Sequence, residues 1–202
     1  MDAREQLLQA ALKVYAASGF RGATTKRIAH EAGVNEVTLF RHFGSKEALL
    51  NEALAWKAEQ ALDCRLPEHP VDPEAELGEF CLRYHAALWE SRDLIRVCMG
   101  EITEFPEAIR AACQAPNRLA EALEAYLERL RTLGLATGNW LPRNAGAMLM
   151  GTVFSDAMGR DCMPQRYPDS PEVAVRAYVS LFLQAIGASS RALSARAPGL
   201  GS

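Results

Sequence analysis

Hydrophobic residues recur at intervals of three and four along most of the chain, which is the spacing of amphipathic helices. In the first predicted helix, over 3–18, Leu8, Leu12 and Tyr15 share one face, and Gly19 is expected to end it. No stretch shows the strict alternation of a β-strand. The pattern therefore predicts an all-α fold.

Two short helices separated by a glycine are predicted between Thr24 and Phe43. Thr24 and Thr25 can cap the first of them, and Gly33 ends it, because glycine takes a left-handed backbone conformation without steric cost. Asn35 can cap the second. Neither helix could bury enough surface to be stable alone, and together they form a helix-turn-helix pattern.

The second short helix has an inner and an outer face. Leu39 and Phe43 are four residues apart and are expected to pack inward, which leaves Val37, Thr38 and Arg41 outside. Such a face fits the major groove of DNA. There Arg41 can pair with guanine or a phosphate, Thr38 with a base edge or a phosphate, and Val37 with a thymine methyl group. Helix-turn-helix pairs also serve plain packing, which the pattern alone leaves open.

Hydroxyls and cations lie at the ends of these two helices. Thr25 begins a helix, where free backbone N–H groups favour a phosphate, and Lys26 adds a cation beside it. His42 and Lys46 flank the far side and are suited to phosphates. The common explanation is that these groups line up along a polyanion.

Prolines separate this region from the remainder. Three of them in CRLPEHPVDPEA predict a boundary between a DNA-binding domain over 1–62, with the helix-turn-helix at about 24–43, and a larger helical domain over 72–190. Residues 191–202 are predicted to be a disordered tail. Within the larger domain, further helices are expected around Leu77–Leu88, Leu94–Ile102, from Pro106, around Leu119–Leu133, and over 143–159 and 171–187.

Composition and charge refine this interpretation. A hydrophobic share of 49% and a charged share of 23% are ordinary for a soluble protein. The net charge of −3 argues against bulk nucleic-acid binding, but residues 1–50 carry seven Lys/Arg against five Asp/Glu. Five widely spaced cysteines indicate a reducing compartment. With no apolar signal segment and no charge-free run near the ~20 residues of a membrane span, a cytoplasmic protein is expected.

The run LLQAALKVYAASGFRGATTKRIAHEAGVNEVTLFRHFGSKEALL resembles the DNA-binding domain of the TetR family of bacterial transcriptional regulators, over roughly residues 4–56. Thr-Thr before Ile-Ala, Gly-Val in the turn, and Thr-Leu, His-Phe and Ser-Lys-Glu after it lie at the family spacing. The resemblance implies a homodimer on a palindromic operator. It also implies a helical regulatory domain with a small-molecule pocket, usually with repression released by that ligand, and no cofactor.

The family's DNA contacts carry over at matching positions. Glu36 is an acid at the groove edge that can accept a hydrogen bond from cytosine N4 or repel a phosphate, so base preference stays open. Phe40 replaces the family's common Tyr and lacks its hydroxyl, and a small residue is common where Val37 stands. The resemblance implies contacts at the start of the second helix by Thr25 and Lys26, in the groove by Glu36, Val37 and Thr38, and to the backbone by Phe40, Arg41, His42 and Lys46.

Two stripes on the last two helices are candidates for a dimer interface. In the family these helices form a four-helix bundle between subunits. Small residues at four-residue steps would let another backbone approach closely, although packing within the domain is the alternative. The candidates are Ala147, Gly151, Ser155 and Gly159, with Val175, Val179, Phe182 and Ile186 as the matching stripe.

The effector pocket is expected to be mainly apolar, with a few polar groups. Side chains at helical spacing also serve as plain core, so the assignments stay open. Candidates are Trp89, Met99, Phe105, Tyr126, Met150 and Phe154, with His85, Glu101, Asn144 and Asp156 as polar candidates.

Other functions are less well supported. Cys81 and His85 have a spacing that could hold zinc, but a core thiol and a satisfied histidine explain them better, so no metal is predicted. No phosphate loop, GxSxG or HExxH occurs, so no enzyme is predicted. The alternative to an operator-binding regulator is a helical small-molecule-binding protein without specific operator binding. Phe40 and Glu36 are the features that favour this alternative.

Overall fold

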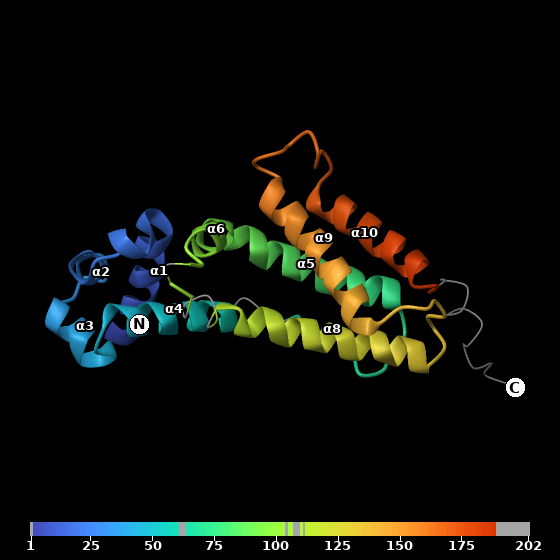
Figure 1. Cartoon of the computed structure of the whole chain (residues 1–202), viewed down its shortest axis with the longest axis horizontal. Helices are drawn as coiled ribbons and strands as arrows, with labels where there is room; N and C mark the ends of the chain where they lie inside the picture. The colour runs from blue at the N-terminus through green and yellow to red at the C-terminus, as the bar shows by residue number, and fades with distance from the viewer. Residues whose placement is uncertain (1, 61–63, 104, 107–109, 111, 189–202) are drawn as a thin grey trace, which may run out of the picture. The chain divides into compact units, whose positions relative to one another are not determined.

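The computed structural model describes residues 2–60, 64–103, 105–106, 110 and 112–188. Regular secondary structure in these ranges is entirely helical, which confirms the all-α prediction (Figure 1). The tail predicted at 191–202 and most of the short helix predicted from Pro106 lie outside them. The helices are α1 (Ala3–Gly22), α2 (Thr25–Glu31), α3 (Glu36–Phe43), α4 (Lys46–Gln60), α5 (Pro73–Glu90), α6 (Arg92–Gly100), α8 (Gln114–Thr132), α9 (Pro142–Gly159) and α10 (Pro171–Ala185).

The chain divides into two compact units, 1–62 with 91–117, and 63–90 with 118–202. The helix α6 thus packs with the N-terminal helices, and the domain boundaries expected from the sequence differ from the units at this segment. The reason lies in α6 and the residues after it, since Cys98 and Phe105 are buried in the same hydrophobic core as α1.

The first unit encloses a core in which α1 packs against α4, α2 and α6. Its fully buried side chains include Leu8, Tyr15, Ile28, Leu39 and Leu49. These are the apolar positions of the repeating three–four pattern, so burial of one face per helix positions α2 and α3 on the scaffold of α1 and α4.

Local signals in the sequence set the ends of the short helices. The Thr24 hydroxyl accepts a hydrogen bond from the Arg27 N–H at 3.3 Å, and the Asn35 side chain accepts one from the Val37 N–H at 2.9 Å. Gly33, with φ of 67°, makes the turn between α2 and α3. The caps predicted at Thr24 and Asn35 are confirmed, whereas Thr25 is the first residue of α2.

Gly19 kinks α1 instead of ending it. Its backbone has φ of 67° and ψ of −177°, and the helix resumes to Gly22. The kink interrupts the ladder of backbone hydrogen bonds, so groups around it need other partners.

The second unit contains α5, most of α8, α9 and α10. The helix α5 packs against both α9 and α10, and these two lie side by side (Figure 1). Its core includes Leu77, Phe80, Leu123, Val153 and Val179. Across the described part of the chain, no helix is long and apolar enough to span a bilayer.

Candidate DNA-binding interface and polar centre

The outer side of the helix-turn-helix presents most of the predicted DNA contacts to solvent. Leu39 is fully buried and Phe43 nearly so, while Val37 is 71% exposed and Phe40 48% exposed. One helix face therefore holds the core and the other is free for a partner. Lys26, Val37, Phe40, Arg41 and His42 are exposed, and Thr25, Glu36 and Thr38 are half-exposed.

A hydrogen bond joins the first residues of α2 and α3. The Thr25 hydroxyl donates to Glu36 Oε1 at 2.5 Å. Each of these two residues was expected to meet DNA separately. Their contact holds the carboxylate in place beside the side chains that are predicted to face the groove.

Lys46 is engaged within the protein. Its Nζ donates to the Phe20 carbonyl oxygen at 3.0 Å and lies 3.7 Å from the centroid of the Phe20 ring. The ammonium thus ties the start of α4 to the kinked end of α1. The contact of Lys46 with the DNA backbone stays a prediction, since its half-buried ammonium has three donors and only one of them is used by the Phe20 carbonyl.

Glu101 completes the anchorage of Phe20. Its two carboxylate oxygens accept the Phe20 N–H at 2.9 and 3.0 Å, and the Phe20 ring stacks on Phe105 with centroids 4.2 Å apart. The kink at Gly19 leaves this N–H without a helical partner, and the carboxylate supplies one. Glu101, a polar candidate for the effector pocket, therefore binds the backbone of the first unit through its carboxylate. In the sequence, the one indication of this contact was the break at Gly19, because such a break leaves a backbone N–H without a helical partner.

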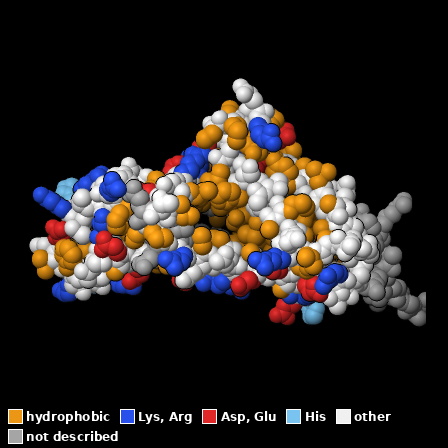
Figure 2. All heavy atoms as spheres, viewed as in Figure 1, with side chains coloured by type: hydrophobic (Ala, Val, Ile, Leu, Met, Phe, Trp, Pro, Cys, Tyr) orange, Lys and Arg blue, Asp and Glu red, His pale blue; other side chains and the backbone are white. Residues whose placement is uncertain are grey.

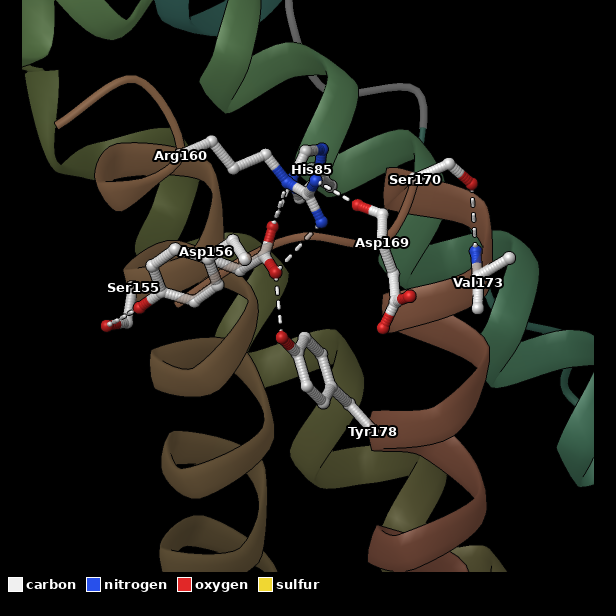
Figure 3. Close-up of polar contacts among 9 residues, drawn as sticks. His85, Ser155, Asp156, Arg160, Asp169, Ser170, Val173 and Tyr178 are labelled. Atoms are coloured by element: carbon white, nitrogen blue, oxygen red, sulfur yellow. Dashed lines mark hydrogen bonds and ion pairs between the residues drawn. The ribbon is translucent and has the colours of Figure 1, made fainter. Parts of the chain in front are cut away.

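A buried polar centre lies in the second unit, where α5, α9 and α10 meet (Figure 3). Asp156 is fully buried on α9, and His85 on α5 is 3% exposed. His85 Nε2 lies 2.7 Å from Asp156 Oδ1, which also accepts from Arg160 Nε at 2.6 Å. Asp156 Oδ2 accepts from the Tyr178 hydroxyl at 2.7 Å and from Arg160 Nη2 at 3.1 Å.

Electrostatics keep this carboxylate ionised. Burial by itself raises the pKa of Asp156, but hydrogen bonds from Arg160, Tyr178 and His85 outweigh it and hold the pKa below its usual value. Burial and the neighbouring carboxylate raise the pKa of Tyr178 to about 12, so its hydroxyl remains a donor. Both Asp156 oxygens are thus occupied by partners from α5, from α10 and from Arg160 at the C-terminal end of α9, which indicates a structural role for this cluster.

Two earlier candidates change role here. His85 and Asp156 were expected as polar groups of an effector pocket, but they bind one another. His85 Nε2 is engaged by Asp156 and so is not free to bind a metal ion, and burial raises the pKa of the Cys81 thiol to about 12. Among the described residues, no group of three His, Cys, Asp or Glu side chains is arranged to hold a metal ion.

The six apolar pocket candidates do not gather in one unit. Met99 and Phe105 belong to the first unit, where Phe105 is buried against Phe20. In the second unit Tyr126 is fully buried, and its hydroxyl donates to Glu76 Oε2 at 2.5 Å. The other three apolar candidates, Trp89, Met150 and Phe154, are half-buried in the second unit. The polar candidate Asn144 is exposed.

The two interface stripes differ in exposure. On α9, Ala147, Gly151 and Ser155 are exposed, whereas Gly159 is buried beneath Tyr167. On α10 the expected stripe is buried inside the chain, and this assignment is corrected: its side chains form the face of α10 that packs on α5 and α9. The buried residues are Val175 at 0%, Val179 at 1%, Phe182 at 3% and Ile186 at 2% exposure.

The opposite face of α10 is apolar as well. Val173 is 57% exposed and Leu181 64%, with exposed Ala177 between them, four residues from each. Met148 on α9 is 52% exposed. Figure 2 shows hydrophobic side chains along the exposed side of α9 and α10. This surface, from Ala147, Met148, Gly151 and Ser155 to Val173, Ala177 and Leu181, is called the α9–α10 face below.

Comparisons with known families match most of the chain. Residues 7–53 match the family of bacterial regulatory proteins described as the tetR family. Residues 75–188 match the C-terminal domain of AefR-like transcriptional repressors.

Curated relatives are similar over different lengths. The HTH-type transcriptional regulator YvkB of Bacillus subtilis is 29% identical over 136 residues, covering 67% of this chain and 71% of YvkB. The nucleoid occlusion factor SlmA of Vibrio campbellii is 31% identical over 159 residues, covering 74% of this chain and 79% of SlmA. The class D tetracycline repressor of Escherichia coli is 29% identical over 97 residues, covering 48% of this chain and 44% of the repressor.

Solved structures share the fold. A TetR-family regulator from Mesorhizobium loti superposes with a TM-score of 0.75 at 23% identity, covering 92% of this chain and 96% of that one. The fatty acid degradation regulator FadR from Bacillus halodurans has a TM-score of 0.71 at 22% identity, covering 91% and 95%. At these identities the likeness concerns the arrangement of the helices.

Proposed function

The chain belongs to the TetR family of bacterial regulatory proteins, and we propose that it binds a palindromic operator as a homodimer and represses transcription until a small molecule releases it. The observation that carries the proposal is the outer face of the helix-turn-helix. Its inner side chains are buried, whereas Lys26, Val37 and Arg41 are exposed and Glu36 and Thr38 are half-exposed. The exposed Val37 lies among these groups, where its side chain can meet an apolar base edge such as the thymine methyl group.

Operator binding should depend on the exposed cations. We expect Lys26→Ala and Arg41→Ala each to weaken binding, by about 1–3 kcal/mol where the side chain reads a base. A variant that loses only a phosphate contact should also show a salt slope smaller by about one. Titrating the duplex that flanks the protein's own gene, at several salt concentrations, measures both quantities.

Arg131→Ala is the matched control, because Arg131 is exposed on α8 and paired with Glu128 at 2.7 Å, remote in sequence from the helix-turn-helix. It should leave binding unchanged. Equal affinity of wild type and both test variants would remove the basis for this interface.

Release by an effector is expected to be reciprocal. The family likeness of residues 75–188 and the half-buried Trp89, Met150 and Phe154 support a mainly apolar pocket in the second unit. A ligand that weakens operator binding must bind the operator complex more weakly by the same factor, typically 1–3 kcal/mol. Hits from a thermal-shift screen, titrated with and without operator, measure this difference. Equal affinity in both titrations for every hit would exclude the region as a switch.

A further inference from the structure

The Thr25–Glu36 contact places an ionised acceptor at the groove-facing end of α3. Glu36 is the first residue of that helix, where the free backbone N–H groups stabilise a negative charge. Its Oε1 receives the Thr25 hydroxyl at 2.5 Å. Among the residues described, Glu36 has no ion-pair partner, so none of them neutralises its charge.

A carboxylate can only accept hydrogen bonds, and one oxygen of Glu36 already holds a donor. In the major groove, guanine presents the acceptors N7 and O6, and thymine presents the acceptor O4, all of which repel it. Cytosine presents the N4 amine. Adenine presents an amine too, but with the N7 acceptor beside it. Cytosine is therefore the base edge that best matches an anionic acceptor held at this place.

Resting on the operator binding proposed above, we propose that Glu36, positioned by Thr25, selects cytosine at one base pair of each half-site through the N4 amine. The selection works by attraction to that amine and by repulsion of the other edges. Thr25 acts on specificity through Glu36, which is a role separate from any contact of its own with a phosphate.

The test begins with selection of duplexes from a random pool by the full-length wild-type protein, followed by affinities for the four base pairs at each selected position. We expect one position per half-site with a cytosine preference of about tenfold. In Glu36→Gln that preference should fall at this position alone, with a gain for adenine, because an amide both donates and accepts and can pair with N6 and N7.

Glu31→Gln is the matched control for the change in charge. Glu31 lies on α2, and its carboxylate pairs with Lys13 of α1. Its replacement should leave every base preference as in wild type. An identical selected sequence for wild type and Glu36→Gln would overturn the specificity proposal while leaving operator binding intact. Failure of the wild type to select any sequence would instead overturn the operator-binding proposal.

Thr25 supplies an independent variant. Thr25→Val keeps the side-chain shape but removes the donor, so the cytosine preference should weaken, and Thr25→Ser should restore it. A threonine that only touched a phosphate would lower the affinity for all four base pairs alike in Thr25→Val. That uniform loss, with an unchanged cytosine preference, would exclude the positioning role.

Discussion

Replacing Asp156 with alanine is expected to lower the free energy of unfolding by about 3–5 kcal/mol, because it removes one partner of a buried ionic cluster. His85 and Tyr178 would lose the carboxylate that satisfies them. The Arg160 guanidinium would keep its bond to the Asp169 carbonyl oxygen at 2.6 Å, but its charge would stay largely buried without a counter-ion. Denaturant unfolding followed by circular dichroism measures the loss.

Asp93→Ala is the control for the loss of an aspartate. Asp93 pairs with Arg96 three residues on at 3.7 Å, and its side chain is 71% exposed. Exposed pairs of this kind contribute about 0.2–1 kcal/mol, so the variant should be close to wild type. Similar stability of Asp156→Ala and Asp93→Ala would show that the polar centre does not hold the second unit together.

The same carboxylate is expected to make the free energy of unfolding depend on pH in the acid range. Since folding lowers the pKa of Asp156, its contribution to stability is present above the unfolded value of about 3.9 and is lost as pH falls through the folded value. Wild type should therefore lose this contribution below about pH 4, and Asp156→Ala should lack that component of the acid transition.

The parts of the fold that depend on residues close together in the sequence could be predicted from the sequence. Caps at Thr24 and Asn35 and the turn at Gly33 act within a few residues, and they place α2 and α3 correctly. The exposed face of α3 followed from the helical spacing of Leu39 and Phe43 alone.

Contacts between distant residues could not be predicted in this way. Glu101 and Phe20 are 81 positions apart, and His85 and Asp156 are 71 apart. The sequence shows that these polar residues exist but not that they meet, so Glu101, His85 and Asp156 were assigned to a ligand instead of to one another or to the backbone. The break at Gly19 indicates that a backbone N–H needs a partner, but nothing near it in the sequence indicates that Glu101 is that partner.

The helix α10 shows a further limit of periodicity. It is apolar on two faces, and the stripe of Val175 and Val179 was assigned to a dimer interface. Because both faces have helical spacing, only the packing on α5 and α9 reveals that this stripe is the core and that Val173 and Leu181 lie on the other side.

Leu181→Glu should convert the proposed dimer to a monomer and weaken operator binding by about 10²–10⁴-fold. Leu181 is 64% exposed on the α9–α10 face, so a glutamate there is tolerated in an isolated chain. In a dimer joined through this face, it would bury a charge without a partner. Operator affinity would then fall because linking two half-site contacts in one molecule supplies that factor. Sedimentation velocity and a titration of the duplex measure the two effects.

The small residues on the same face offer an independent variant. Apart from the backbone of its own helix, a Cβ on Gly151 would meet no atom of the described residues within 4 Å, so Gly151→Leu should fold normally and disturb only a partner. Ala125→Glu is the control, since Ala125 is exposed on α8 outside the α9–α10 face, and it should leave both the mass and the affinity unchanged. If Leu181→Glu and Gly151→Leu both sediment as stable dimers, the subunits must meet elsewhere, because an interface of this face could accept neither the charge nor the added volume.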